Sequence, residues 1–268
     1  MTTQAPSSTP LSTPMELRLL HRPEEMSAAS ELVAQIWKVQ NTQSHVSPEL
    51  LTAFAHAGNY VAGGFRGHEL MAVCVGFFYQ PRENALHSHI AGVRPDAAGT
   101  GWGRALKHHQ RDWCLARGVT RVTWTYDPLV ARNAYFNLHK LGCEVEVYLP
   151  DFYGPMGDGL NQGQHSDRIM VAWHIGQATA PSRAEKEHGP AVLRSVDRRP
   201  QLDLGRAESL PRCVVEIPSD IEALRRHEPE LAISWRLALR RALGGLLEEG
   251  WGVVDFDRRG HYCLTRST

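Results

Sequence analysis

The sequence predicts a mixed α/β protein organised around one β-sheet, and three observations lead to this prediction. First, a chain of 268 residues with 42% hydrophobic residues is long and apolar enough for one large domain, or for one domain and a smaller one. Second, short apolar stretches alternate with segments of helical period up to residue 175, in the order β-α-α-β-β-β-α-β-α-β-β. Third, the polar, proline-containing stretch from Gly176 to Pro190 interrupts this pattern.

Strands are expected where short apolar stretches end at turn residues. The segment Arg66-Gly67-His68 is such a turn, because it separates two of these stretches. The expected strands of the first region are Met15–Leu20, Tyr60–Phe65, Leu70–Tyr79, Ala85–Val93, Val119–Tyr126, Glu144–Leu149 and Arg168–Ile175.

Helices are expected where apolar residues recur three or four positions apart, with proline in the first turn and glycine after the last. Asp127-Pro128 is a candidate cap for a turn or a helix. The expected helices run from Pro23 to Trp37, from Ser47-Pro48-Glu49 to near Gly58, from the loop Gly99–Gly103 to Gly118, and from Asp127-Pro128 to Gly142.

The chain divides into a disordered segment 1–14, a first domain 15–175, a linker 176–190 and a C-terminal α/β region 191–268. In that last region the expected elements are a strand Cys213–Ile217, a short helix after Pro218, a long helix from Pro229 to Gly250, and a hairpin of Trp251–Phe256 with His261–Leu264. This β-α-α-β-β order matches the order of residues 15–79, so the region is either a partial repeat or an unrelated α/β cap. The long helix carries an apolar stripe, with Arg236 expected at its rim. The stripe consists of Ala232, Trp235, Leu239, Ala242, Leu243 and Leu246.

The composition excludes several classes of function. Lys and Arg number 29 and so do Asp and Glu, so the chain lacks the basic surplus of a nucleic-acid binder. Its five cysteines lie far apart, which argues against a disulfide framework or a zinc site and favours buried, reduced thiols. The longest apolar run, Leu70–Tyr79, is about half of a membrane span, and residues 1–14 have no apolar core. We therefore expect a cytoplasmic protein with no metal and no membrane partner.

The strongest local signal is the segment Val93-Arg-Pro-Asp-Ala-Ala-Gly-Thr-Gly-Trp-Gly-Arg104, in which a strand enters a loop of three alternating glycines and a helix begins. Unpaired N–H groups and the helix dipole at such an end favour an anion, and glycine lets the anion approach the main chain. A Walker loop is excluded, because Gly103 is followed by Arg104 and Ala105 rather than by Lys and Ser or Thr. A dinucleotide fingerprint fits poorly, because Arg104 stands where its last glycine belongs.

Residues 15–175 resemble the GNAT N-acetyltransferase superfamily. The glycine segment is similar to the family's phosphate-binding motif, Q/R-x-x-G-x-G/A, with Gly101 and Gly103 on its two glycines. Asn133-Ala134 and the run Lys140 to Cys143 resemble a later family segment. Two positions depart from the family. Ala98 stands where it usually has Gln or Arg, and Leu138 stands where a catalytic Tyr is often found.

The resemblance implies a GNAT acyl-CoA N-acyltransferase fold and an acetyl-CoA-dependent transfer to an amine. Arg104 is either a partner for the 3′-phosphate or a solvated helix residue. The implied ligands of acetyl-CoA are Gly92, Val93, Gly99, Thr100, Gly101, Trp102, Gly103, Arg104 and Asn133.

The catalytic acid and base are less defined. His87 and His89 share one face of a strand, where each is a structural hydrogen-bonder, a base or a metal ligand, and we select His89 as the base. Tyr135 is the candidate acid, since it lies one helical turn before Leu138, although it also suits a packing role. Tyr153 is a second candidate, in the insert Asp151–Asp167, which is either a cover for the acceptor or a solvent loop.

The sequence leaves three functional classes open. The first is an N-acetyltransferase acting on a small-molecule or peptide amine, the second is a non-catalytic acyl-CoA-binding protein, and the third is an interaction protein that forms a homodimer through the long helix. The identity of the acceptor is not readable, because one fold serves many acceptors.

Overall fold

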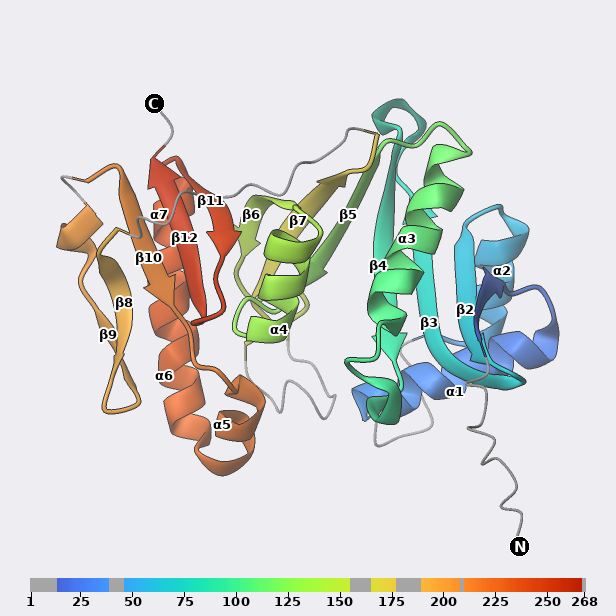
Figure 1. Cartoon of the computed structure of the whole chain (residues 1–268), viewed down its shortest axis with the longest axis horizontal. Helices are drawn as coiled ribbons and strands as arrows, with labels where there is room; N and C mark the ends of the chain where they lie inside the picture. Colours follow the sequence, from blue (N-terminus) through green and yellow to red (C-terminus); the bar gives the residue numbers. More distant parts are fainter. Residues whose placement is uncertain (1–13, 39–45, 155–164, 177–188, 208–209, 267–268) are drawn as a thin grey trace, which may run out of the picture.

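The chain forms two β-sheets in series, one of seven strands and one of five (Figure 1). The computed structural model describes residues 14–38, 46–154, 165–176, 189–207 and 210–266. The segment expected to be disordered lies outside these residues except for Pro14, and so does most of the expected linker. The division of the chain at 176–190 therefore stays a prediction.

The first sheet has the strand order β1-β2-β3-β4-β5-β7-β6. Its strands are β1 (Met15–Leu19), β2 (Tyr60–Arg66), β3 (Glu69–Phe78), β4 (Ala85–Val93), β5 (Arg121–Tyr126), β6 (Glu144–Leu149) and β7 (Arg168–His174). Its helical elements are α1 (Pro23–Trp37), α2 (Pro48–His56), α3 (Trp102–Leu115), α4 (Ala131–Ala134), the π-helical segment η3 (Tyr135–Lys140) and the short 3₁₀ turns η1 (Pro81–Glu83) and η2 (Pro95–Ala97). The predicted α/β class and the predicted element order of residues 15–175 are confirmed.

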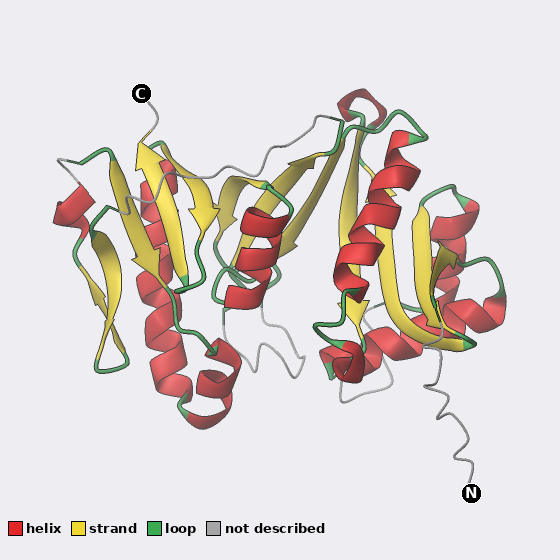
Figure 2. Ribbon diagram, viewed as in Figure 1, coloured by secondary structure: helices red, strands yellow, loops and turns green. Residues whose placement is uncertain are grey.

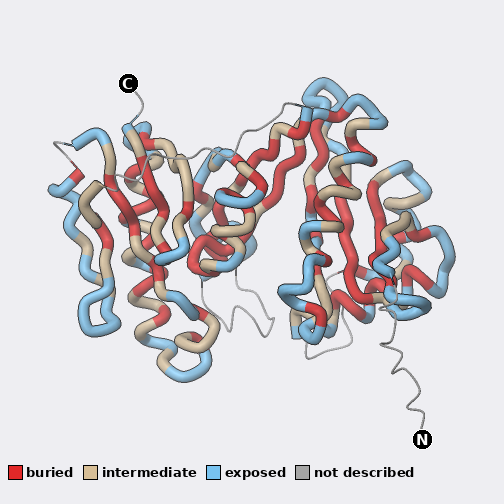
Figure 3. Tube along the Cα trace, viewed as in Figure 1, coloured by how far each residue is buried: buried red, intermediate tan, exposed pale blue. Residues whose placement is uncertain are grey.

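Helices cover both faces of the first sheet (Figure 2). The pair α1 and α2 packs on one face, around a core that includes Met26, Leu51 and Val73. Helix α3 packs on the other face, where Trp102 and Leu106 join a second core. Ser47 fixes the start of α2, as expected, because its Oγ accepts the N–H of Leu50 at 3.3 Å. Figure 3 shows the buried residues concentrated in the strands between these layers.

The second sheet has the order β11-β12-β10-β8-β9. Its elements are β8 (Ala191–Val196), β9 (Arg199–Leu202), the 3₁₀ turn η4 (Leu204–Ala207), β10 (Arg212–Glu216), α5 (Ile221–His227), α6 (Pro229–Leu239), the π-helical segment η5 (Arg240–Gly244), α7 (Gly245–Glu248), β11 (Trp251–Phe256) and β12 (His261–Arg266). The hairpin β8–β9 was not expected, because its turn consists of Asp197 and Arg198, both at positive φ. Such turns normally use Asn or Gly.

The second sheet repeats a part of the first, but a different part from the one that element order suggests. In residues 15–79 the first strand, β1, pairs with the second, β2, whereas β10 pairs with the third strand of its group, β12. The pairing instead follows the other half of the first sheet. There β4 and β5 are parallel, and so are β8 and β10 of the second sheet. The antiparallel pair β5–β7 corresponds to β10–β12, and the antiparallel pair β6–β7 corresponds to β11–β12.

Two further details support this correspondence. A π-helical segment precedes β6 and another precedes β11 in the chain. The β6–β7 ladder shifts register between Val145 and Val147, and the β11–β12 ladder shifts between Val253 and Asp255, so the first strand of each hairpin carries an irregularity. The connection between β8 and β10, in contrast, holds β9 and η4 where the first sheet has the glycine loop and α3.

The two sheets share one hydrophobic core, and β6 lies beside β11 (Figure 1). Tyr148 on β6 packs against Gly244 of η5, where a Cβ atom would stand 3.5 Å from its ring. The Tyr262 hydroxyl on β12 donates to the carbonyl of Pro128 at 2.7 Å. The predicted stripe of the long helix is buried in this core, so its apolar face is covered by the chain itself.

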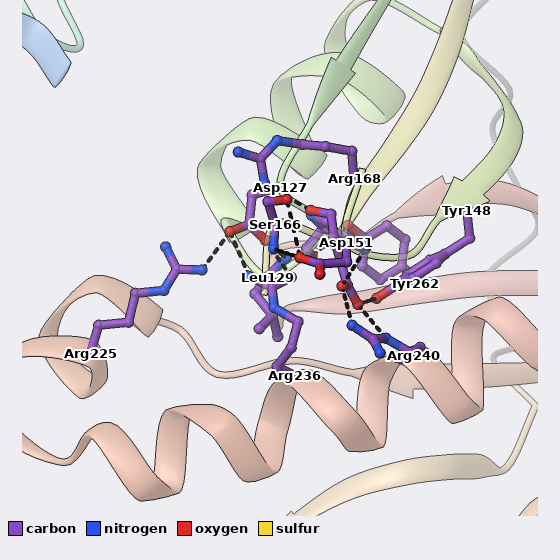
Figure 4. Close-up of polar contacts among 12 residues, drawn as sticks. Asp127, Leu129, Tyr148, Asp151, Ser166, Arg168, Arg225, Arg236, Arg240 and Tyr262 are labelled. Carbon is purple, nitrogen blue, oxygen red and sulfur yellow. Dashed lines mark hydrogen bonds and ion pairs between the residues drawn. The ribbon is translucent and has the colours of Figure 1, made fainter. Parts of the chain in front are cut away.

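A buried ion cluster joins the end of β5 to the second sheet (Figure 4). Arg236 donates to both carboxylate oxygens of Asp127, at 2.8 and 2.7 Å, and Arg225 donates to the same carboxylate. Arg236 is therefore fully buried, with 1% of its surface exposed, and not at a rim as expected. Burial alone would raise the pKa of Asp127, but Arg236 and Arg225 hold it well below its usual value. Asp127 also accepts the N–H of Leu129 at 2.9 Å, so it caps a turn, while Val130 precedes α4.

A second carboxylate ties the insert between β6 and β7 to the second sheet (Figure 4). Asp167 accepts from Arg240 of η5, from the Tyr148 hydroxyl at 2.7 Å, and from the main-chain N–H of Asp151 at 3.0 Å. Burial acts to raise the pKa of Asp167, and the donors Arg240 and Tyr148 outweigh this effect and lower it. Asp167, directly before β7, therefore fixes both ends of the insert against the second sheet.

We expect Asp127→Ala to destabilise the protein by about 3–5 kcal/mol, because two buried guanidinium groups would lose their counter-charge. The free energy of unfolding in denaturant measures this effect. Arg132→Met is the matched control, since it breaks the more exposed Arg132–Glu222 pair and should cost less than about 1 kcal/mol. Equal losses in both variants would contradict a structural role for the cluster.

Candidate functional site

The glycine loop lies between β4 and α3, at the end of the first sheet. Gly99 has φ +79° and Gly101 has φ +98°, values that L side chains rarely adopt, so glycine is required at both positions. No atom lies within 4 Å of a Cβ built on either residue. On Gly103 such a Cβ would meet only a methyl group of Val93, at 4.0 Å. The loop therefore presents main chain to open space.

The amides of this loop have no acceptor within the described chain, except that of Thr100, which donates to the carbonyl of Ala97 at 3.4 Å. Ala105 donates its N–H to Gly101 at 3.0 Å, which closes the first turn of α3. The N–H groups that precede it and make no hydrogen bond to described residues are those of Gly99, Gly101, Trp102, Gly103 and Arg104. Five free donors at the start of a 14-residue helix form a nest that suits a phosphate group.

The side chains of the loop pack or form hydrogen bonds away from these amides. The Trp102 side chain is buried and packs over Gly64 of β2, where a Cβ atom on Gly64 would stand 2.8 Å from the indole ring. Trp102 therefore contributes only its main-chain N–H to the nest. The Thr100 hydroxyl donates to the carbonyl of Ala97 at 2.7 Å. Arg104 is exposed and its Nε lies 3.3 Å from Nε2 of His108. Gly92 lets α1 approach β4, since a Cβ there would meet Ile36 at 2.8 Å.

Strands β4 and β5 form a fork beside the glycine loop. They pair in parallel over three residue pairs only, and the last pair is His87 with Thr123. Beyond it, Ser88–Val93 of β4 and Trp124–Tyr126 of β5 have no pairing with each other, although β4 keeps β3 and β5 keeps β7 as partners. We call the last pair the vertex of the fork. Main-chain groups on the inner sides of both prongs are thus available to a ligand.

The face of the fork that carries α1 and α2 holds the two histidines. The rings of His87 and His89 lie 6.2 Å apart, and each lies within 6 Å of the ring of Phe77, which places them on one face as expected. His89 is the extra residue of a β-bulge, because Val75 pairs with Ile90 while the next residue of β3 pairs with Ser88. Bulges of this kind often redirect a side chain at a functional site.

Thr123 links the vertex to β3 through hydrogen bonds that the sequence did not predict. Its Oγ1 lies 3.1 Å from Nδ1 of His87 and 2.9 Å from the Tyr79 hydroxyl. Burial lowers the pKa of His87 to about 4, with further lowering by His89 and Lys107. His87 is therefore neutral at physiological pH and held in place by a hydroxyl.

The structure separates the candidate acids. Thr125 lies on the same face of β5 as Thr123, and its Oγ1 is 3.1 Å from the Tyr153 hydroxyl, so Tyr153 reaches the histidine-bearing face of the sheet. The Tyr135 hydroxyl instead accepts from Nε of Arg258, at 3.1 Å, in the hairpin of the second sheet. The structure does not bring Tyr135 together with His89, and its role stays a prediction.

The remaining sequence-based candidates differ in how far they are buried. Asn133 lies half-buried in α4, and its main-chain N–H bonds the carbonyl of Val130 at 2.9 Å. Leu138, where the family often has a Tyr, is buried in the core. Ala98 is exposed at the loop. The insert is described at 151–154 and 165–167, and Asp158 lies outside the described residues.

No family model matches the chain, and no curated protein matches it. Solved structures do match. The ribosomal-protein-S18-alanine N-acetyltransferase from Escherichia coli shares 18% identity at a TM-score of 0.48, over 64% of this chain and 99% of that one. The PaiA N-acetyltransferase from Thermoplasma acidophilum, in complex with coenzyme A, shares 17% at 0.45, over 59% and 98%. An acetyltransferase of the GNAT family from Streptococcus pneumoniae shares 12% at 0.48, over 59% and 98%.

The described part of the chain also bears on membrane spans, metal sites and cavities. No helix there is long and apolar enough to cross a membrane. No group of three or more His, Cys, Asp or Glu residues there is arranged to hold a metal ion. A cavity of about 460 Å³ lies between the β8–β9 turn and the start of α6, and two of its lining residues, Arg198 and Glu228, pair with each other.

We expect Gly101→Glu to weaken CoA binding by on the order of 100-fold, because a carboxylate would enter the nest and the strained φ would displace at least two amide donors. Titration calorimetry with CoA measures the loss. Gly118→Glu is the matched control, since Gly118 has φ +73° and equally open surroundings but lies beyond the other end of α3. If both variants bound CoA like the wild type, the placement of the diphosphate at this loop would be wrong.

Proposed function

We propose that the protein is an acetyl-CoA-dependent N-acetyltransferase that transfers an acetyl group to the amine of a small molecule or a peptide. The observation that carries the proposal is the nest of five free amides between β4 and α3, next to a fork in the sheet. A nest binds a diphosphate, and a fork supplies main-chain partners for an extended amide-bearing arm. Coenzyme A combines these two chemical features in one molecule.

We propose a place for each part of acetyl-CoA. The diphosphate would lie on the amides of Gly99 to Arg104, and Arg104 extends from the same turn toward solvent. The pantetheine arm would lie between the prongs of the fork and pair with main chain near Gly92 and Val93. The thioester would then reach the vertex, near the bulge at His89. Asn133, from α4, would contact the pantetheine arm.

The acceptor amine would approach from the face that carries α1 and α2. Direct attack on the thioester needs orientation, a base for the ammonium, and stabilisation of the developing oxyanion. His89 is exposed on this face, and Tyr153 reaches the same face from the insert. We keep His89 as the base. Tyr135 is retained as a candidate acid only if its bond to Arg258 is exchanged during turnover.

A non-catalytic acyl-CoA-binding protein is the second candidate. Two observations favour it. The position that often carries a catalytic Tyr holds the buried Leu138, and the loop position that usually carries Gln or Arg holds Ala98. Both departures leave the amide nest unchanged. The two candidates therefore agree on cofactor binding and differ only in turnover.

We expect CoA to raise the midpoint of thermal unfolding of the wild type, because a ligand that binds only the folded state stabilises it by mass action. Gly101→Glu should show no such rise. Release of free thiol from acetyl-CoA over a panel of small and peptide amines then separates the two candidates. A rise without thiol release supports the binding protein, and no rise contradicts both.

We expect His89→Ala to lower the rate at neutral pH by on the order of 100-fold while the affinity for CoA is kept, because a general base would be lost. A base must be deprotonated to act, so the wild-type rate should increase as the pH rises, and His89→Ala should lose this increase. If His87 were the base, its pKa of about 4 would leave the rate flat above about pH 5. The choice of His89 would be overturned by a wild-type rate that is flat above about pH 5, together with a loss of activity in His87→Ala but not in His89→Ala.

A further inference from the structure

Lys107 is a buried lysine on α3 that the function described above does not use. Only 4% of its surface is exposed, and no carboxylate pairs with it among the described residues. Taking an ammonium group out of water without a counter-charge is costly, so such lysines are rare unless a partner arrives. Burial lowers the pKa of Lys107, and the partial compensation comes from thiols rather than from acids.

The Lys107 ammonium lies at the vertex of the fork. It donates to the Ser88 hydroxyl at 2.8 Å and stands 3.7 Å from the ring centre of Trp124. Ser88 and Trp124 are the first residue of each prong beyond the last pair of β4 with β5. The Nζ atom therefore contacts both strands at the point where their pairing stops, on the face that carries α3.

The groups around Lys107 are neutral at physiological pH. Gln110 of α3 accepts from Nζ at 3.3 Å and donates to Cys74 of β3 at 3.4 Å. Burial raises the pKa of the thiols that face the lysine, which are those of Cys74, Cys114 and Cys143. His87 lies across the sheet and has a lowered pKa. The groups that surround Lys107 thus include no anion.

We propose that Lys107 stabilises the thiolate of coenzyme A as it leaves the thioester at the vertex of the fork. The inference rests on the proposed function, because it requires acetyl-CoA in the fork. The acceptor nitrogen forms a bond to the acyl carbon, the carbon–sulfur bond breaks, and the electron pair stays on sulfur. The Lys107 ammonium donates a hydrogen bond to that sulfur and then its proton, while the proton of the acceptor nitrogen goes to the base on the opposite face.

This placement divides the proton transfers between the two faces of the sheet. The histidines lie on the face of α1 and α2, and Lys107 lies on the face of α3, so a base and an acid flank the thioester from opposite sides. The arrangement also accounts for Leu138, which stands where the family often has a catalytic Tyr. Lys107 of α3 would supply the acid in place of that Tyr.

The test compares the binding of CoA with that of desulfo-CoA, which lacks the thiol. Titration calorimetry over about pH 6 to about pH 10 gives the ratio of the two affinities for the wild type and for Lys107→Met. If Lys107 lowers the pKa of the bound thiol by one unit, the wild type prefers CoA by about tenfold once the thiol is ionised. We expect Lys107→Met to lose this preference and Lys107→Arg to keep most of it. Lys140→Met, an exposed lysine on η3, is the control for loss of a positive charge.

Binding of desulfo-CoA also reports whether each variant is folded. If neither ligand bound the wild type, the proposed function would fail and this inference with it. If both bound and the wild type showed no preference for CoA at any pH, the inference alone would be overturned, whatever the variants did. An equal preference in the wild type and in a folded Lys107→Met would overturn it as well.

Discussion

The short ladder between β4 and β5 is the constraint on which the candidate site depends. Three residue pairs hold the strands together, and past His87 and Thr123 each strand keeps only its outer neighbour. A sheet that parts in its middle loses inter-strand hydrogen bonds, and these groups need another partner. Lys107 and Trp124 occupy one side of the vertex. Thr123 occupies the other side with its two partners, the Tyr79 hydroxyl and the His87 imidazole. The fold therefore maintains an interrupted sheet by filling the vertex with polar and aromatic side chains.

The second sheet supports the fork from one side. Asp127 directly follows β5, and Asp167 directly precedes β7, which is the outer neighbour of β5. Both carboxylates are held by arginines of the long helical stretch α6–η5. One prong of the fork is thus fastened to a second layer of structure, while the other prong is covered by α1 and α3. The second sheet repeats the pairing of β4 to β7 but lacks a glycine loop, so it contributes support without a second nest.

Local signals in the sequence were enough for the first sheet and for the loop. Glycines at 99, 101 and 103 stand where a strand meets a helix, and each neighbouring element has a clear period. Contacts between distant segments were not readable. Arg236 follows Trp235 on an apolar helix, and only the position of Asp127, 109 residues earlier, makes its burial favourable. The same holds for Lys107, whose neighbours in sequence suggest a solvated position. The β8–β9 turn was missed because Asp197 and Arg198 adopt a conformation that their residue types seldom take.

The contact between β6 and β11 has a consequence for how copies of the chain can associate. The outer edge of β6 would otherwise present unpaired main-chain groups, and exposed strand edges tend to recruit further strands. Here the chain's own second sheet stands against that edge, in an arrangement that relates β6 to β11 as equivalent strands of the two repeats. The chain therefore supplies internally the kind of neighbour that a second molecule would provide. Among the described residues, β1 and β9 form the far edges of the two sheets.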